Sequence, residues 1–344
     1  MVNAEGQFSE NVSRFQAYAR RRLLLSRLSL AALALGMLSC AAPTPAATAA
    51  EYPIKPIRLI VPFAPGGGTD IVARLLAQKL TEALAQPVVV DNRPGAAGNI
   101  GVGITLSAAP DGYTLIMVST SYATNAALYK LAYDPIRDVT PIALIGETGF
   151  LVSAHPNVPA KNIKELIAVA KAKPLHYGSS GSGGIIHLAT ELFNIMAGTN
   201  MTHVPYKGSG AALNDLLGGH IQLIFSSTSV IPHVRSQRLR GIAVTTSKRL
   251  PALPEVETIA EAGVAGYEAV LWYGLLGPKG MQKHVVSRLN TEIRAVTRST
   301  AVKEQLAVAL LDVVDADPEF FDTVIKRDVS KWAKVVKTAG IRVE

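Results

Sequence analysis

One segment near the start of the chain limits what the chain can fold into: an apolar strand that runs directly into a glycine loop and then into a helix. Residues 59–70 read Leu-Ile-Val-Pro-Phe-Ala-Pro-Gly-Gly-Gly-Thr-Asp, and apolar residues follow at helical spacing from Val72 to Leu84. The first N–H groups of such a helix have no partner within it, and its dipole favours an anion there by roughly 0.3 to 2 kcal/mol. The segment therefore predicts a main-chain site for a small anion, although Pro-Gly-Gly-Gly is equally compatible with a simple tight turn.

Nucleotide binding does not fit the spacing of these glycines. A phosphate loop requires Gly-x-x-x-x-Gly-Lys-Ser/Thr, and no Gly-Lys pair occurs in the chain. The dinucleotide fingerprint also fails, because Ile71 stands where a third glycine should follow Gly66 and Gly68. A small anion held by the main chain is the remaining functional interpretation.

A second loop of the same kind follows about 110 residues later. Residues 175–184 read Leu-His-Tyr-Gly-Ser-Ser-Gly-Ser-Gly-Gly, and a helix is predicted from Ile185. Hydroxyl groups would supplement the main-chain donors here, or Ser179 or Ser182 would cap the helix. The Gly-x-Ser-x-Gly nucleophile elbow is absent, so a catalytic serine has little support. Two such loops in two α/β segments predict one ligand in a cleft between two lobes.

The first 50 residues have the features of a secretory signal peptide. Arginines at positions 20, 21, 22 and 27 precede the apolar run 28–38, and small residues follow. An apolar core of about 11 residues is too short for a membrane span, which needs roughly 20. We therefore expect residues 1–50 to direct export to the periplasm, with a disordered basic tail as the alternative. The arginines are also compatible with the twin-arginine route, and Cys40 is compatible with lipid attachment, although Met37-Leu38-Ser39 departs from the usual lipoprotein box.

The composition of the remaining chain indicates a small-molecule partner. Removing 50 of 344 residues leaves 294, which suits two domains, and removing five Arg and two Glu lowers the net charge from +8 to +5. A modest positive charge attracts anions. The remaining chain has no basic run with interleaved aromatic residues, so the sequence does not predict nucleic-acid binding. Cys40 is the only cysteine, so the exported part cannot form an internal disulfide, which is compatible with a bacterial periplasm.

Strand and helix patterns alternate along this part of the chain, which predicts α/β architecture with largely parallel sheets. Ligands bind such sheets at the carboxyl ends of their strands, where the loop after Phe63 lies. Strands are predicted over residues 57–63, 88–90, 114–118, 142–145, 149–154, 175–177, 203–205, 223–225 and 241–244. Helices are predicted over residues 71–84, 99–108, 163–172, 185–197, 211–217, 285–298, 301–309 and 318–338.

A series of short segments along residues 52–344 identifies a family by number, order and spacing. The segments are Tyr52-Pro53, Pro56-Ile57, 61–67 with Asp70, 91–96, 98–101, 110–115, 177–184 with His187-Leu188, 203–208, 243–245, 261–263 and 272–274. Each segment alone is weak. Together they resemble the solute receptors of tripartite tricarboxylate transporters, often called the Bug family.

The resemblance implies a type II periplasmic binding-protein fold without catalytic residues or a cofactor. Lobe 1 would comprise residues 51–152 and 270–344 and lobe 2 residues 153–269, with crossings near residues 149–153 and 269–274. Such receptors close on a small carboxylate by hinge motion and deliver it to membrane permease subunits. We expect a monomer. The ligand contacts implied by position, largely main chain and partly through water in the first loop, are Phe63, Ala64, Pro65, Gly66, Gly67, Asp70, Ser179, Ser180, Gly181, Gly183, Gly184, Tyr206 and Lys207.

Some candidate side chains have a second interpretation. Asp70 is better suited to orient its own helix than to touch an anion, which it would repel. Lys207 either meets a distal carboxylate or is an exposed lysine in a turn. Ser119 and Thr120 follow the predicted strand 114–118 and should face the cleft together with residues 122 and 125, and an ordinary polar loop is the alternative. Trp272 would pack the hinge rather than the ligand.

Two departures from the family pattern concern the ligand. Gly184 stands where the family commonly has serine, and Ser226 follows Phe225 where the family often has aspartate. Loss of that carboxylate disfavours a ligand with an ammonium group. Two other functions remain open, a receptor that signals through a membrane sensor and an exported hydrolase. The sequence shows no nucleophile beside a base, and the seven histidines have no metal-binding spacing, so we expect neither catalysis nor a metal.

Overall fold

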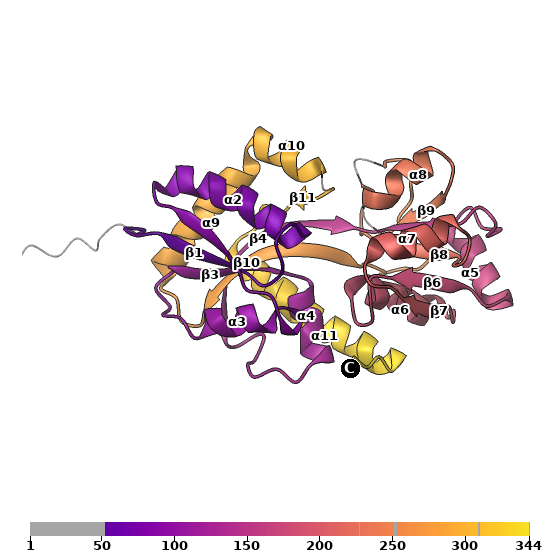
Figure 1. Ribbon diagram of the computed structural model, residues 1–344, viewed down its shortest axis with the longest axis horizontal. Coiled ribbons are helices and arrows are strands. Elements are labelled where there is room, and N and C mark those ends of the chain that lie inside the picture. The colour runs from indigo at the N-terminus through magenta and orange to yellow at the C-terminus, as the bar shows by residue number, and fades with distance from the viewer. Residues whose placement is uncertain (1–51, 227, 251–252, 309, 344) are drawn as a thin grey trace, which may run out of the picture. The chain divides into compact units, whose positions relative to one another are not determined.

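The chain builds two β-sheets that are joined by two crossings (Figure 1). The structure is a computed structural model that describes residues 52–226, 228–250, 253–308 and 310–343. The predicted signal peptide and the predicted lipidation site Cys40 lie outside these residues. Among the helices in the described ranges, none has the length and apolar character needed to cross a membrane.

The first sheet has six strands in the order β11-β4-β10-β3-β1-β2. They are β1 (Ile57–Val61), β2 (Val88–Asn92), β3 (Thr114–Ser119), β4 (Val139–Gly149), β10 (Val270–Pro278) and β11 (Asp312–Val313). β1 pairs in parallel with β2 and β3, whereas β10 is antiparallel to β3 and β4, and β11 is antiparallel to β4. Both faces of the sheet are apolar, because Leu115 and Met117 of β3 face one core and Ile116 and Val118 face the other.

Helices cover both faces of this sheet (Figure 1). The face of Met117 packs against α2 (Gly68–Leu84), α9 (Lys283–Arg298) and α10 (Thr300–Val308). The face of Val118 packs against α3 (Asn99–Leu106), α4 (Ser121–Leu128) and α11 (Pro318–Ala339). Asp317 caps α11 by accepting a hydrogen bond from the N–H of Phe320 at 2.7 Å, and Gly340 ends it in the left-handed conformation. A short 3-10 helix, η1 (Ala96–Gly98), precedes α3.

The second sheet has five strands in the order β7-β6-β8-β5-β9. They are β5 (Leu151–Ala154), β6 (His176–Ser179), β7 (Thr202–Pro205), β8 (Leu223–Ser226) and β9 (Arg240–Val244). Its helices are α5 (Ile163–Ala172), α6 (Ile185–Ala197), α7 (Ser209–Leu217) and α8 (Ile231–Arg235), with η2 (Thr228–Val230) before α8. β6 is parallel to β7 and β8, and β5 is antiparallel to β8 and β9.

The buried residue Thr245 forms hydrogen bonds to both segments that cross between the two sheets. The chain leaves the first sheet through Phe150, between β4 and β5, and returns through Ala269, directly before β10. The Thr245 hydroxyl accepts from the N–H of Phe150 at 2.7 Å and donates to the carbonyl of Ala269 at 2.7 Å. The main chain of Thr245 also bonds to both residues. The crossings therefore form one hydrogen-bonded unit.

The prediction of largely parallel sheets is wrong. Of the nine strand pairs, five are antiparallel, because β4, β5 and β10 belong to crossings that run against their neighbours. The α/β architecture itself is confirmed. The helices predicted over residues 163–172 and 185–197 have the predicted bounds, whereas α4, α8 and β11 were not predicted.

Candidate functional site

The first glycine loop leaves the carboxyl end of β1 and leads into α2. Gly67 is the N-cap of the helix without any side-chain cap, and Ala64 to Gly68 are all exposed. The N–H groups of the first turn, from Gly68 onward, have no partner within the helix. The loop therefore presents main-chain donors, not side chains, to its surroundings.

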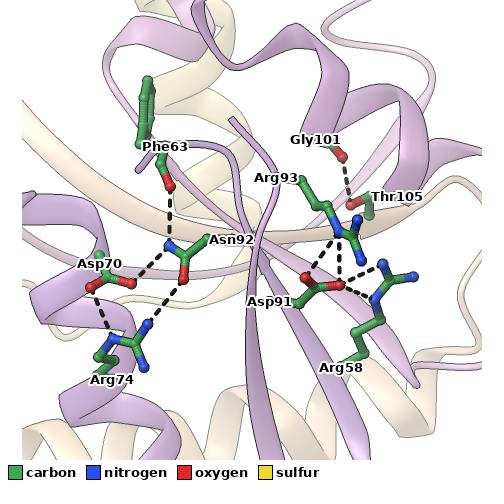
Figure 2. A network of polar contacts seen from close by, with 9 residues as sticks. All are labelled: Arg58, Phe63, Asp70, Arg74, Asp91, Asn92, Arg93, Gly101 and Thr105. Carbon is green, nitrogen blue, oxygen red and sulfur yellow. Dashed lines mark hydrogen bonds and ion pairs between the residues drawn. The ribbon is translucent and has the colours of Figure 1, made fainter. Parts of the chain in front are cut away.

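A buried carboxylate holds this loop in place (Figure 2). Asp70, only 2% exposed, accepts hydrogen bonds at 2.9 Å from the N–H of Gly66 and from Nε of Arg74. Its other oxygen accepts from Nδ2 of Asn92 at 2.9 Å, and this amide also donates to the carbonyl of Phe63 at 3.0 Å. Arg74 in turn donates to Oδ1 of Asn92 at 2.9 Å. The network joins both ends of the loop to the helix and to β2.

The charge of Asp70 is satisfied within this network. Burial alone would raise its pKa, but hydrogen bonds from Arg74, Gly66 and Asn92 outweigh burial and lower the pKa to about 2. The Arg74 guanidinium neutralises the carboxylate at 2.9 Å, so the loop does not repel an anion. The geometry supports the interpretation that Asp70 orients its own helix.

Two further arginines, Arg58 of β1 and Arg93 directly after β2, surround Asp91 (Figure 2). Asp91 accepts from Nε of Arg58 at 2.8 Å and from Nε of Arg93 at 3.1 Å. Partial burial acts to raise the pKa of Asp91, but the bonds from Arg58 and Arg93 lower it below its usual value. Two arginines around one aspartate leave a net positive charge close to the first loop, which favours the approach of anions.

The structure separates the two candidates that follow β3. Thr120 is completely buried, and its hydroxyl donates to the carbonyl of Val270 at 3.2 Å and accepts from the N–H of Trp272 at 2.8 Å. Its one donor serves β10, which leaves none for an anion. Ser119, 6% exposed, has its hydroxyl 2.9 Å from that of Ser121.

A small hollow lies between the first loop and α4. Phe63, Ser119, Tyr122 and Asn125 are among its lining residues, and its volume is about 10 Å³, enough for about one water molecule. Tyr122 donates to the carbonyl of Pro135 and Asn125 to that of Ala97, so both side chains support neighbouring loops. The hollow is suited to a bridging water.

The second glycine loop follows β6 and ends at Gly184, the N-cap of α6. No side chain caps this helix, so capping by Ser179 or Ser182 is a wrong prediction. Gly183 needs to be glycine, because its φ is +75° and a Cβ there would lie 2.6 Å from Val343. Ser180 is exposed and Gly181 is half-buried, so these residues of the loop are open to a ligand.

Ser179 and two histidines, His187 and His203, hold this loop through hydrogen bonds. The Ser179 hydroxyl lies 2.6 Å from Nε2 of His203 and also accepts from the N–H of Gly181 at 3.1 Å. The ring of His187 stacks on that of His203 with centroids 3.7 Å apart, and its Nδ1 accepts from the N–H of Gly183 at 3.0 Å. The prediction that no nucleophile lies beside a base is therefore wrong, because the fold places the Ser179 hydroxyl next to His203. Ser179, however, is completely buried and bonded within its loop.

Both histidines are uncharged at neutral pH. Burial lowers the pKa of His203 to about 4. Burial, together with repulsion from His203, lowers the pKa of His187 to about 4. An uncharged His187 keeps the lone pair on Nδ1 that accepts from Gly183, and an uncharged His203 places no charge beside the ring that stacks on it.

The remaining candidates from this lobe differ in whether their side chains are already bonded within the protein. Tyr206 donates to Oδ2 of Asp215 at 2.7 Å, and burial with this hydrogen bond raises its pKa to about 12. Lys207 is exposed and forms no ion pair with any described residue. Ser226, which replaces the common aspartate, is 1% exposed and lies 3.1 Å from the hydroxyl of Ser229. Trp272 is completely buried and donates to Asp328, which agrees with its predicted packing role.

Sequence reasoning missed the residues that shape the two loops from a distance. Asn92 and His203 lie within family segments, but no pattern in the sequence indicates that they bond to residues 22 and 24 positions away. Tyr273 was also missed as a site residue, although its hydroxyl points at the start of α2, where a Cβ on Gly68 would lie 2.5 Å from it.

Comparison with known proteins establishes the family. The family model described as the tripartite tricarboxylate transporter family receptor matches residues 72–341. The chain belongs to this family of receptors. It is 37% identical to BugT of Bordetella pertussis over 310 residues, which are 88% of this chain and 94% of BugT.

Solved structures of related receptors share the fold. Rpa4515 of R. palustris, solved with adipate, is 37% identical with a TM-score of 0.71, covering 85% of this chain and 99% of that chain. MatC from Rhodopseudomonas palustris, with bound malate, is 30% identical with a TM-score of 0.68, covering 83% and 100%. The predicted Bug-family membership and two-lobed type II fold are confirmed. Members of this family are periplasmic binding proteins. Within the described ranges of this receptor, no group of three or more His, Cys, Asp or Glu could hold a metal ion.

Proposed function

We propose that this receptor captures a small carboxylate in a cleft between its two lobes. The observation that carries the proposal is the first loop, whose exposed main chain at the start of α2 is held by the buried Asp70 network. A carboxylate there would accept hydrogen bonds from the free N–H groups of the first helical turn. The adipate of Rpa4515 and the malate of MatC, both small dicarboxylates, support this choice of ligand class.

The proposed contacts are largely main chain. From the first loop they are residues 63–67 and the free N–H groups of the first turn of α2, except that the N–H of Gly66 is already bonded to Asp70. From the second loop they are Ser180 and the main chain of residues 181–184, with Lys207 in reach of a distal group. The side chains of Asp70 and Ser179 position these loops, that of Thr120 bonds to β10 and that of Tyr206 bonds to Asp215, and in this proposal none of the four touches the ligand.

We propose hinge closure of the two lobes as the response to the ligand. Lobe 1 comprises residues 51–152 and 270–344 and lobe 2 residues 153–269, with the hinge at the two crossings. Because Thr245 bonds to Phe150 and Ala269, the two crossing segments would bend as one. After export and removal of residues 1–50, the closed, monomeric receptor would deliver the ligand to the permease subunits of a tripartite tricarboxylate transporter.

The pair formed by Ser179 and His203 does not favour hydrolysis. A nucleophile must reach its substrate, and Ser179 is completely buried. Among the described hydrogen bonds, none joins His203 to a carboxylate that would orient it as a base. We propose that the pair stabilises the second loop and that the protein has no catalytic activity.

Thermal unfolding against a ligand panel tests the function. The chain from Glu51 onward is melted with mono-, di- and tricarboxylates, aromatic acids and amino acids. A ligand of the folded form at 100 times its Kd adds about 2.7 kcal/mol, so one carboxylate class should raise the melting temperature saturably and be recovered unchanged. No shift from any compound of a ligand-stripped protein would contradict the proposal, and consumption of the compound would indicate an enzyme.

A further inference from the structure

The hydroxyl of Tyr273 lies at the N-terminus of α2, inside the proposed binding site. Tyr273 is on β10, where it pairs with Ser119 at the carboxyl end of β3. A Cβ built on Gly68, the first residue of α2, would lie 2.5 Å from this hydroxyl and 3.6 Å from the ring carbon that bears it. The side chain therefore reaches from the crossing strand to the first turn of the helix.

The side chain of Tyr273 is largely buried, but its hydroxyl is not fully enclosed and has no partner among the described residues. Tyr273 is 8% exposed, and burial raises its pKa to about 12. Among the hydrogen bonds between described residues, none involves its hydroxyl, whereas the buried Tyr52 donates to Gly112 and Tyr267 to Ala189. A hydroxyl that makes no hydrogen bond within the protein keeps its donor for a water or a ligand.

We propose that the Tyr273 hydroxyl donates a hydrogen bond to the ligand carboxylate bound at the start of α2. This inference rests on the proposed function and specifies the only side-chain donor that we assign to the first loop. A carboxylate has two oxygens, so one can accept from the first-turn N–H groups while the other accepts from Tyr273. A ligand that presents a donor there, such as an ammonium group, would leave both kinds of donor unpaired.

Gly68 is explained by the same geometry. Its backbone has no strained conformation, and alanine favours helices more than glycine does, so local structure does not require glycine at this position. A Cβ at this position would lie 2.5 Å from the Tyr273 hydroxyl, so the hydroxyl would have to move away from the helix terminus. Glycine at residue 68 thus leaves room for the hydroxyl beside the helix terminus.

The test compares Tyr273→Phe with the matched control Tyr52→Phe in isothermal titration of adipate, malate and any further carboxylate that binds the unmodified receptor. Hydrogen bonds to charged groups contribute enough that Tyr273→Phe should weaken binding about 10-fold to 100-fold. Its melting temperature without ligand should hardly change, because no bond within the protein is lost. Tyr52→Phe removes the bond to Gly112, so it should lower the melting temperature and leave affinity unchanged.

A double-mutant cycle with Gly68→Ala locates the effect. In the unmodified receptor the added methyl group should displace the hydroxyl and weaken binding. In Tyr273→Phe it has ordinary contact with the ring at 3.6 Å and should have little further effect. Affinity of Tyr273→Phe equal to that of the unmodified receptor, or additive effects in the cycle, would overturn the inference alone. Failure of the unmodified receptor to bind any carboxylate would overturn the proposed function and the inference with it.

Discussion

At the scale of single residues, the first loop depends on the carboxylate of Asp70, which we propose does not contact the ligand. Asp70 sits in the first turn of α2, where the helix dipole favours a negative charge, and its oxygens accept from a loop N–H, an arginine and an amide. These bonds fix the loop before any ligand arrives. A pre-organised loop binds more tightly because less conformational entropy is lost on binding.

Replacing this carboxylate tests its role. Asp70→Asn keeps the size of the side chain but loses the charge, and its amide group would face at least one of the present donors. We expect the free energy of unfolding to fall by roughly 1 to 3 kcal/mol and carboxylate affinity to fall about 10-fold. Chemical denaturation and titration calorimetry measure the two effects.

Asp91→Asn is the matched control for this prediction. Asp91 also bonds to two arginines, but Arg58 and Arg93 are half exposed, so such pairs contribute roughly 1 kcal/mol or less. Affinity should be nearly unchanged. Equal losses of affinity in both variants would show that charge near the site matters and the loop network does not.

At the scale of elements, the segment from β6 to α6 depends on two neutral histidines. His203 on β7 meets Ser179, and His187 on α6 meets the N–H of Gly183. The titratable groups that pack around them are Tyr177 of β6 and Glu191 of α6, which are hydrogen-bonded to each other. Among the described hydrogen bonds and ion pairs, none joins Glu191 or another carboxylate to either imidazole, so acid should loosen the second loop.

The pH dependence of stability follows from the same pKa values. Histidine has a pKa near 6.5 in the unfolded chain and about 4 here, so the unfolded state binds more protons between these values. The stabilisation is complete above about pH 6.5 and is lost as the pH falls toward 4. Between pH 7 and pH 5 we expect a loss of about 2 kcal/mol for each histidine, measured as a fall in melting temperature.

A histidine on the surface provides the control. His203→Gln keeps a polar group beside Ser179 but cannot titrate, so its stability should change less with pH than that of the unmodified receptor. His284→Gln changes an exposed residue of α9 and should leave the pH profile as it was. Asp70 does not interfere, because its pKa of about 2 places its titration below this range. An unchanged profile in His203→Gln would contradict the assignment.

Elements whose pattern is local were predictable from the sequence, and those defined by distant partners were not. The apolar stripe of α5 and α6 and the glycine loops before α2 and α6 are local, so their positions were correct. The helix α4 is short and rich in Ser, Thr and Asn, and its stability comes from packing Tyr122 against the first sheet. The direction of β10 follows from its return from the second sheet, which no local pattern encodes.

The candidate site was predictable to the same extent. Its exposed glycines follow from sequence alone, because backbone that approaches a ligand requires them. The bonds from Asp70 to Asn92 and from Ser179 to His203 join residues brought together only by the fold. The same holds for Tyr273 and Gly68, which are about 200 residues apart in the chain.

At the scale of the whole molecule, the proposed site is divided between the two sheets. The first loop follows β1 of the first sheet and the second loop follows β6 of the second, while Thr245 bonds the crossings to each other. In the proposed closure, a ligand gains contacts from the second loop only when the lobes approach. The energy of these contacts would then favour the closed state over the open one.

The most direct test of this account is titration calorimetry of the Gly67→Leu variant with the carboxylate that stabilises the unmodified receptor most. Gly67 has an ordinary conformation, and the nearest atom to an added Cβ is the carbonyl oxygen of Ala64 at 3.8 Å, so leucine should fold normally and cover the exposed donors. Gly103→Leu, at an open position on α3, is the matched control. We expect a melting temperature without ligand close to that of the unmodified receptor, binding lost in Gly67→Leu, and binding retained in Gly103→Leu. Unchanged affinity in Gly67→Leu would contradict capture of the ligand by the first loop.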